Sequence, residues 1–211
     1  MVTEIPLIKI KDLSKRFNRE WIFRNLTYQF NRGSIYVFTG PNGSGKSTLL
    51  QVITGAIPPT DGSLTYYNVN NSEIAIDNIY KKIAVATPYM DLIEEFTLDE
   101  HLSFHFGMRN IRYELTLAEL KNIMYLENAG SKHIQNFSSG MKQRLKLGLA
   151  FYTEADIVFL DEPGTNLDQT AFNWYYNQLL KVPKECTVII ASNNPQEYPE
   201  NSKRIDILSY K

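Results

Sequence analysis

The sequence has little cysteine, no long hydrophobic run and no excess of charge of one sign. One cysteine, Cys186, among 211 residues excludes a disulfide within the chain and fits a reducing compartment. No apolar stretch approaches the ~18–20 residues that a membrane-spanning helix needs, and the N-terminus lacks a signal-peptide pattern. A net charge of -1 gives no global basic field, so nucleic acid is not expected as a partner. We therefore expect a soluble chain that reaches any membrane through another protein.

A glycine-rich loop between a strand and a helix is the strongest signal that the sequence does contain. Ile35–Thr39 is typical of a buried strand, and a helical pattern begins near Lys46. The spacing G-x-x-x-x-G-K-S between them is that of a phosphate-binding loop, in which backbone N–H groups surround an anion. The predicted nucleotide-binding residues are Gly40, Pro41, Asn42, Gly43, Ser44, Gly45, Lys46, Ser47 and Thr48. Lys46 would reach the β- and γ-phosphates, and the Ser47 hydroxyl suits Mg²⁺.

The remaining patterns predict an α/β fold in which a P-loop NTPase core has a mostly parallel sheet. Short segments such as Ile8–Ile10 and Trp21–Phe23 indicate an N-terminal antiparallel β subdomain, and residues 97–152 indicate an inserted helical subdomain. Two capping boxes, Thr97 with Glu100 and Thr116 with Glu119, mark helix starts there. Further expected elements are strands at Ile157–Leu160, Thr187–Ile190 and Ile205–Leu208, and a crossover helix at Leu167–Val182. We expect one domain over residues 1–211.

Phosphoryl transfer also needs a metal ligand and a group that orients water. Asp161 and Glu162 follow the apolar run at Ile157–Leu160, where a parallel strand delivers side chains to the ligand edge of the sheet. Asp161 would hold Mg²⁺ and Glu162 would polarise the attacking water, although a solvated acidic turn has the same pattern. Residues 137–144, FSSGMKQR, indicate a helix N-terminus that offers a second anion site, or simply a capped helix.

The order of these motifs resembles the nucleotide-binding subunits of ABC transporters, over about residues 8–208. Gly40–Thr48 matches the family's Walker A motif and Ile157–Glu162 its Walker B motif with the catalytic glutamate. Phe137–Met141 stands at the signature, and Gly164–Asp168 looks like the D-loop. Phe17, 23 residues before Gly40, stands where the family stacks an aromatic ring on adenine, although core packing is an alternative.

The resemblance implies an ATP- and Mg²⁺-dependent ATPase that closes head to tail with a second ATPase subunit, either a second copy or a related chain. Ser138 and Gly140 of one subunit would then contact the γ-phosphate held by the other subunit. The resemblance also implies a transmembrane permease subunit, docked near Tyr89–Ile93, and a cytoplasmic location on the inner face of the membrane. Packing within the chain is an equal alternative for Tyr89–Ile93.

Two positions depart from the family pattern. Pro88 stands where the family has the glutamine of its Q-loop, with the Thr87 hydroxyl as a nearby substitute, and Asn193 replaces the switch histidine. Asparagine can donate a hydrogen bond to a γ-phosphate oxygen but carries no positive charge. We expect an active ATPase with Lys46, Glu162 and Asn193 as catalytic residues; slow turnover, or a regulatory subunit with impaired hydrolysis, stays open.

The alternative functions are a soluble ABC ATPase of repair, translation or cluster assembly, and a GTPase or small-molecule kinase. Residues 49–136 lack the sustained heptads of repair-type members, the chain is not basic, and it has one cassette rather than two. No Asn-Lys-x-Asp guanine motif is present. The sequence identifies neither the transported substrate nor its direction.

Overall fold

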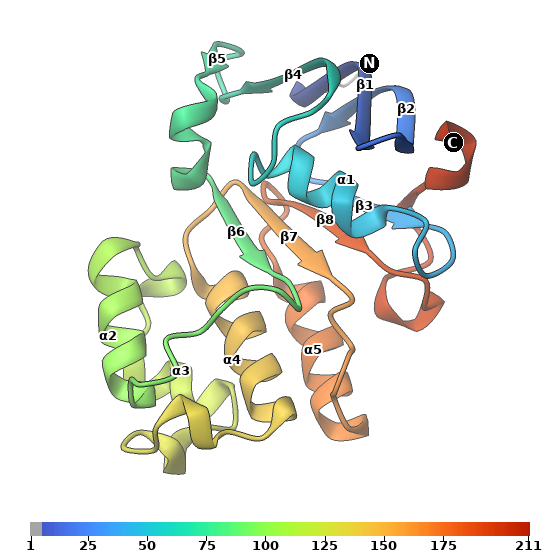
Figure 1. Cartoon of the computed structure of the whole chain (residues 1–211). Helices are drawn as coiled ribbons and strands as arrows, with labels where there is room; N and C mark the ends of the chain where they lie inside the picture. The colour runs from blue at the N-terminus through green and yellow to red at the C-terminus, as the bar shows by residue number, and fades with distance from the viewer. Residues whose placement is uncertain (1–5) are drawn as a thin grey trace.

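The structure, a computed structural model that describes residues 6–211, contains two β-sheets (Figure 1). The strands of the smaller sheet are β1 (Pro6–Phe17), β2 (Glu20–Asn31), β4 (Asp61–Tyr67) and β5 (Glu73–Ile74). They are antiparallel in the order β2-β1-β4-β5. Asn18 joins β1 to β2 with a left-handed backbone (φ 51°), a conformation that asparagine tolerates. The predicted antiparallel start is confirmed.

The larger sheet is parallel. Its strands are β3 (Ile35–Thr39), β6 (Ile83–Ala86), β7 (Ile157–Asp161), β8 (Thr187–Ala191) and β9 (Lys203–Asp206). Their order is β6-β7-β8-β3-β9. Every residue of β7 and β8 is buried, as their continuous apolar runs predicted.

The last strand lies earlier than the sequence predicted. Strand β9 ends at Asp206 because that residue pairs with Thr39, the last residue of β3. The Asp206 carboxylate then accepts a hydrogen bond from the N–H of Leu208 (3.0 Å) and caps a short 3-10 helix, Ile207–Tyr210. The predicted strand through Leu208 is therefore wrong at its C-terminal end.

Helices cover both faces of the parallel sheet. Helix α1 (Lys46–Ile53) and the antiparallel sheet lie on one face, and α4 (Ser139–Tyr152) and α5 (Gln169–Lys181) lie on the other (Figure 1). Successive residues of β7 alternate between the two hydrophobic cores: Phe159 packs on the α1 side and Val158 on the α4 side. Helix α5 is slightly shorter than predicted because Asp168 caps its start and its end is followed by Pro183.

The helical subdomain contains α2 (Leu98–Met108), α3 (Leu117–Ile123) and α4. Both predicted capping boxes are confirmed, since Thr97 and Thr116 each exchange hydrogen bonds with the glutamate three residues on. Other 3-10 helices lie at Ile76–Lys81, Arg112–Glu114, Glu127–Ala129, Ile134–Asn136 and Pro195–Glu197. Of these, Arg112–Glu114, Glu127–Ala129 and Ile134–Asn136 fall within the 97–152 span. The boundaries of that span and the single-domain assignment stay predictions. Within residues 6–211 no helix combines the length and hydropathy of a bilayer span.

Candidate functional site

The phosphate-binding loop lies between β3 and α1, as predicted. Gly45 caps α1 with φ +101°, and a Cβ there would stand 2.4 Å from the Ile22 side chain, so only glycine fits. Gly43 also has a left-handed backbone (φ +75°). Helix α1 has no acidic residue in its first turn to occupy its free N–H groups. The loop therefore presents backbone donors at the positive end of a helix dipole.

Lys46 lies across this loop and is buried. Its Nζ donates to the carbonyl oxygens of Gly40 (2.9 Å) and Pro41 (3.1 Å). The neighbouring hydroxyl of Ser44 is buried too, and it meets no hydrogen-bond partner among the described residues. The loop thus offers two donors to phosphate oxygens. The Lys46 ammonium can exchange its carbonyl acceptors for them, and the Ser44 hydroxyl has no acceptor to give up.

Asp161 meets the loop from the neighbouring part of the sheet. It is the last residue of β7, is almost fully buried, and its Oδ1 accepts a hydrogen bond from the Ser47 hydroxyl (3.0 Å). The pKa of Asp161 is raised to about 6, mainly by burial and to a smaller extent by the charge of Glu162, although the Ser47 hydrogen bond and Lys46 act to lower it. A buried carboxylate beside a hydroxyl is a site that gains from a cation.

The donor set at this position fits Mg²⁺. The ion is usually held by one or two protein oxygens together with waters and substrate phosphates, rather than by a cage of protein carboxylates. Ser47 and Asp161 supply two such oxygens. The described residues contain no group of three or more His, Cys, Asp or Glu side chains arranged for a metal. Phosphate oxygens would therefore have to complete the coordination.

Glu162 follows Asp161 in a strained backbone conformation. Its φ is 45°, in the left-handed region that glutamate seldom adopts, and its N–H donates to the Ala191 carbonyl at the end of β8 (2.9 Å). Backbone strain of this kind concentrates at functional positions. The half-buried side chain stands directly beside the predicted metal ligand.

Asn193 also reaches the phosphate-binding loop. It follows β8 and is exposed, and its Nδ2 donates to Oδ1 of Asn42 (2.7 Å). The preceding residue, Ser192, is fully buried and donates its N–H to the Phe38 carbonyl of β3 (3.1 Å). The structure therefore brings together Asn42, Lys46, Ser47, Asp161 and Asn193 at the carboxyl ends of β3, β7 and β8.

Phe17 lies at the end of β1 and is 47% exposed, so the alternative of core packing is wrong. The Nζ of Lys15 stands over its ring, 4.9 Å from the centroid, and is itself held by the Pro58 carbonyl (2.7 Å). An exposed ring backed by a cation is available for stacking. Its role against adenine stays a prediction.

The signature residues are not brought to this site. Ser138 caps α4, where its Oγ accepts the N–H of Met141 (3.2 Å). Figure 1 shows this start of α4 at the opposite end of the helix from β7, far from the loop before α1. A Cβ on Gly140 would stand 3.1 Å from the Asn166 carbonyl, which places the signature beside the D-loop. Ser138 and Gly140 therefore lie away from the phosphate-binding loop of their own chain, and their contact with a γ-phosphate stays a prediction.

The Pro88 region is held by α4 rather than by the site. Nζ of Lys146 donates to the carbonyls of Thr87 (3.2 Å) and Pro88 (2.9 Å). The Thr87 hydroxyl makes no hydrogen bond to the phosphate-binding loop or to Asp161 within residues 6–211. Nearby, Tyr89 is 72% exposed while Leu92 is buried, so the alternative of packing within the chain holds for Leu92.

Sequence reasoning gave no role to Gln143 and Glu197, which the structure places around the D-loop. The buried Gln143 amide donates to the Pro163 carbonyl (2.9 Å), which ties the signature helix to the turn after Glu162. The buried Glu197 carboxylate accepts the N–H of Gly164 (3.1 Å), and burial raises its pKa. Gln143 lay within the signature-like segment, whereas Glu197 has no sequence signal because it lies in a polar stretch of the sequence.

The sequence of this chain is similar to those of ABC transporter ATP-binding proteins. A family model described as "ABC transporter" matches residues 23–165. The ABC transporter ATP-binding protein YybJ of Bacillus subtilis is 30% identical over 193 residues, which cover 90% of this chain and 87% of that protein. ATP-binding cassette sub-family A member 2 of Rattus norvegicus is 28% identical, and the chain spans 9% of its length.

Solved structures agree on the fold. The structure described as the ATP-binding subunit of an ABC transporter is 28% identical, with a TM-score of 0.73, 88% of this chain covered and 79% of that one. A putative ABC transporter ATP-binding protein from Pyrococcus furiosus has a TM-score of 0.77 at 22% identity, with 96% of this chain covered and 98% of that one. The predicted α/β fold with a P-loop NTPase core is confirmed.

Proposed function

Since the chain belongs to the ATP-binding protein family of ABC transporters, we propose that it binds Mg²⁺-ATP at Gly40–Thr48, hydrolyses it and thereby drives a separate membrane subunit. One observation carries the site assignment: the hydrogen bond between Ser47 and Asp161 (3.0 Å), beside Lys46 on its two carbonyls. The bond joins the two motifs that Mg²⁺-dependent phosphoryl transfer requires.

Phosphate binding begins with an exchange of acceptors at Lys46. Its Nζ leaves the carbonyls of Gly40 and Pro41 for β- and γ-phosphate oxygens, so a neutral acceptor pair is replaced by an anionic one. The N–H groups of the loop and of the α1 N-terminus hold the same phosphates. Phe17 offers its exposed ring face to adenine, which is worth about 1–3 kcal/mol where bases stack on aromatic side chains.

The Ser47 hydroxyl and the Asp161 carboxylate would hold Mg²⁺, with phosphate oxygens as the other ligands. When bound, the ion neutralises charge that develops on the phosphates during transfer. Glu162 accepts the proton of the attacking water. Asn193 moves from Asn42 to a γ-phosphate oxygen through the same Nδ2 donor.

The site is completed by a second copy of the chain. Ser138 caps the N-terminus of α4 and Gly140 lies in its first turn, at the end of the helix that is remote from its own phosphate-binding loop. Helix N-termini bind phosphate. ATP held by one copy would be covered by α4 of the other, so ATP binding and dimer closure are coupled. A related chain in place of the second copy is the alternative.

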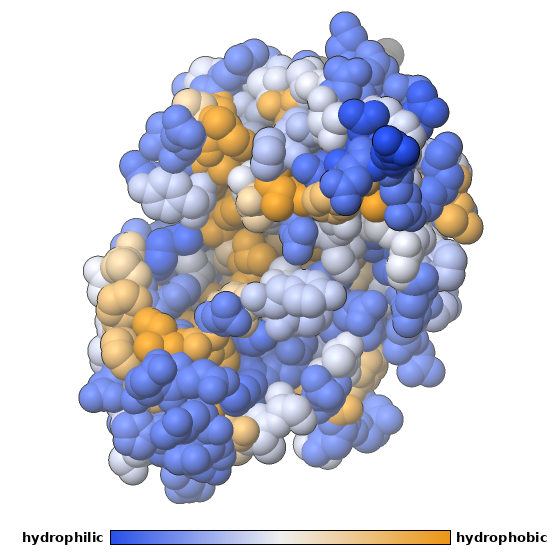
Figure 2. Space-filling view, in the orientation of Figure 1, coloured by the Kyte–Doolittle hydropathy of each residue, from blue (hydrophilic) through white to orange (hydrophobic). Residues whose placement is uncertain are grey.

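The membrane subunit would dock beside Tyr89. A groove of about 250 Å³ lies between β6, α2 and α4, with Val85, Met90 and His105 among its lining residues. Figure 2 shows hydrophobic residues over the adjacent α2, where Phe104 and Met108 are exposed. An apolar groove of this kind suits an amphipathic helix. Docking there would place the chain on the cytoplasmic face of the membrane.

The alternative functions have less support. The relatives found are ABC transporter proteins, which does not favour a soluble repair, translation or cluster-assembly ATPase. A regulatory subunit with weak hydrolysis is supported only by Pro88 and Asn193. Lys46, Asp161 and Glu162, which supply the groups that phosphoryl transfer needs, are all present. No nucleic-acid partner is proposed.

Binding of a fluorescent ATP analogue to the purified chain tests the site directly. We expect Mg²⁺-dependent binding that Lys46→Ala weakens by at least about tenfold, since that change removes the cationic donor. Lys11→Ala, an exposed lysine on β1, is the matched control and should bind like the wild type. Absence of binding to the wild type would contradict the proposal. Co-purification of a hydrophobic protein from detergent-solubilised membranes tests the transport role.

A further inference from the structure

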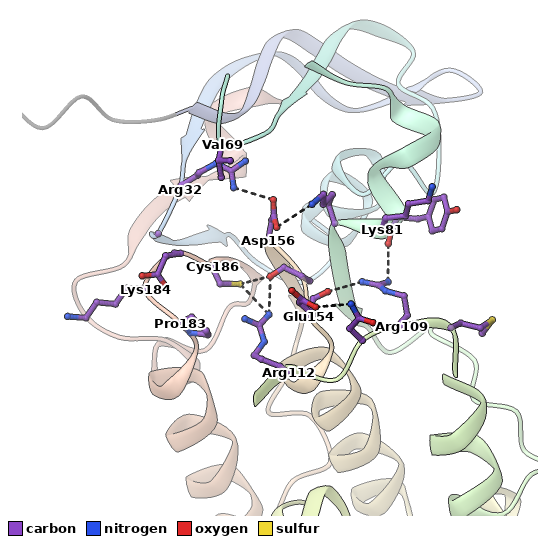
Figure 3. A pocket seen from close by; sticks show the side chains of 17 residues that line it. Arg32, Val69, Lys81, Arg109, Arg112, Glu154, Asp156, Pro183, Lys184 and Cys186 are labelled. Atoms are coloured by element: carbon purple, nitrogen blue, oxygen red, sulfur yellow. Dashed lines mark hydrogen bonds and ion pairs between the residues drawn. The ribbon is translucent and has the colours of Figure 1, made fainter. Parts of the chain in front are cut away.

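A large cavity opens at the edge of the parallel sheet opposite the ATP motifs (Figure 3). Its volume is about 820 Å³, within the range of sites for small organic ligands, roughly 300–1,000 Å³. Lys82, Asp156 and Cys186 line it, and each directly precedes a strand of the sheet: β6, β7 and β8, respectively. The cavity therefore lies at the amino edge of the parallel sheet, opposite the carboxyl edge that carries the candidate ATP site.

Cations outnumber carboxylates in the lining two to one. The basic residues are Arg32, Lys81, Lys82, Arg109, Arg112 and Lys184, and the acidic ones are Glu154, Asp156 and Glu185. This surplus contrasts with the chain as a whole, which has a net charge of -1. A positive surplus within a concave surface focuses the field and attracts anions.

The arginines on the floor are held mostly by neutral acceptors. Arg109 donates to the carbonyls of Tyr80 and Ile83, both at 3.0 Å. Arg112 donates to the carbonyls of Thr153 (3.1 Å) and Ala155 (3.0 Å). Carbonyl contacts fix a guanidinium in place without cancelling its charge.

Asp156 is the carboxylate that neutralises positive charge in the cavity. It pairs with Arg32 (3.3 Å) and stands 4.0 Å from Lys82, while Glu154 accepts from the Asn110 amide (3.0 Å). Among the described residues, no carboxylate ion pair is formed by Lys81, Arg109, Arg112 or Lys184. The surplus of positive charge is therefore not neutralised locally.

Two buried donors in the wall are also unsatisfied. The Nε–H groups of Arg32 and Arg112 meet no acceptor within residues 6–211. A buried donor without an acceptor is destabilising, and an acceptor in the cavity would satisfy it after a small rotation of the guanidinium group. Arg32 and Arg112 come from opposite walls, one above and one below Asp156 in Figure 3.

Apolar groups share the lining with these cations. Val69, Met108, Pro183 and the buried Cys186 lie around the basic residues. A bare inorganic anion would leave this surface in contact with water. A phosphate ester would use both parts of the lining, with its phosphoryl group on the cations and its organic portion on the apolar side chains.

We propose that this cavity is a second ligand site, which binds the phosphoryl group of a phosphate ester, either a small soluble ester or a phospholipid headgroup. Rim lysines Lys81, Lys82 and Lys184 capture the anion, and the arginine floor orients it. Met108 and Arg109 come from α2 and its C-terminus, whereas Lys184 and Cys186 precede β8. The bound ester would therefore contact both the helical subdomain and the core.

Calorimetric titration of the full chain with phenyl phosphate tests the soluble source. The chain is first saturated with Mg²⁺ and a non-hydrolysable ATP analogue, so that the phosphate-binding loop is occupied. A Lys81→Ala/Lys82→Ala/Lys184→Ala variant should lose at least about tenfold in affinity, because charge-assisted hydrogen bonds to phosphate are among the strongest. These lysines are exposed, so the fold should be retained.

The matched control, Lys11→Ala/Lys132→Ala/Lys211→Ala, removes the same charge from exposed lysines outside the cavity. Sedimentation with vesicles of phosphatidylglycerol and phosphatidylcholine, against phosphatidylcholine alone, tests the lipid source. Binding of either probe that the rim variant loses and the control variant keeps supports the proposal and identifies the source. The proposal is overturned if the wild type binds neither probe, or if the rim and control variants bind a probe equally well.

Discussion

The two edges of the parallel sheet are built from the same strands but in opposite ways. At the carboxyl edge, short polar side chains meet one another, as Ser47 meets Asp161 and Asn42 meets Asn193, on backbone that includes left-handed Gly45 and Glu162. At the amino edge, long arginine side chains donate hydrogen bonds to backbone carbonyls of several elements.

The contacts at the carboxyl edge can be exchanged for contacts to a ligand, whereas those at the amino edge are fixed. At the carboxyl edge, the donors Lys46 and Asn193 can exchange their present acceptors for phosphate oxygens, and the Ser47 hydroxyl can exchange its hydrogen bond for a metal ion. We therefore expect this edge to change partners during a reaction. The arginine contacts at the amino edge join α2 and the following turn to the starts of β6 and β7, so they hold the helical subdomain on the core. We therefore expect substitutions at the carboxyl edge to affect turnover and those at the amino edge to affect stability.

The largest effect is expected for Glu162→Gln. Loss of the proton acceptor should lower the rate of ATP hydrolysis by about 10²–10⁴-fold, the usual contribution of general base catalysis. Glutamine keeps the size and backbone of the residue, so ATP affinity should persist. Phosphate release under saturating Mg²⁺-ATP measures the rate. A rate close to that of the wild type would remove Glu162 from the mechanism.

Arg112→Met should affect stability instead. The change removes the donors to the carbonyls of Thr153 and Ala155 and leaves these acceptors without their partner. We expect the free energy of unfolding to fall by about 1–3 kcal/mol, measured by urea denaturation. Affinity for the ATP analogue should stay near the wild-type value. A large loss of ATP affinity at unchanged stability would break the distinction between the two edges.

Asn193→His tests how far the carboxyl edge departs from its family. Histidine restores a group that can carry positive charge beside the γ-phosphate. If asparagine limits turnover, kcat should rise by about tenfold, equivalent to about 1.4 kcal/mol in the barrier. An unchanged kcat would mean that asparagine at position 193 does not limit the rate of hydrolysis.

The smallest expected effect is the pH dependence that His105 gives to stability. The half-buried ring contacts the Thr153 hydroxyl (2.8 Å), and partial burial, with Arg109 and His101, lowers its pKa from 6.5 to about 4. Between these values the unfolded chain binds more protons, so this stability is present above pH 6.5 and is lost as pH falls toward 4. These pKa values alone would make the free energy of unfolding about 2 kcal/mol lower at pH 5 than at pH 7. Solvent screening at the half-exposed ring should reduce this difference to about 1 kcal/mol or less. His105→Asn should reduce this slope, measured by urea denaturation at both pH values. An equal slope in the variant would contradict the assignment to His105.

Local patterns in the sequence predicted much of the carboxyl edge. The glycine spacing and the strand–loop–helix context located Lys46 and Ser47, and the apolar run of β7 placed Asp161 at the strand end. These signals are local because one turn or one strand determines them. The cap at Asp206 and the Lys146 contact to Pro88 depend on pairing between distant segments, so the sequence misplaced the end of β9 and missed that contact.

The amino edge had no sequence signal at all. Its cavity is lined by residues from Arg32 to Cys186, contributed by segments that the fold alone brings together. Single arginines and lysines in loops look like an ordinary solvated surface. Glu197 was overlooked for the same reason, because only the fold shows that its carboxylate is buried against Gly164.

The central claim is that the carboxyl edge is half of an ATPase site and that a second copy completes it. Phosphate release by a mixture of Lys46→Ala and Ser138→Arg chains tests this most directly. Each variant alone should be inactive, whereas a mixed dimer contains one site with an intact Lys46 and an intact Ser138. The mixture should recover about a quarter of the wild-type rate, because half the dimers are mixed and each has one intact site. No recovery, with both variants folded and dimeric, would contradict the account.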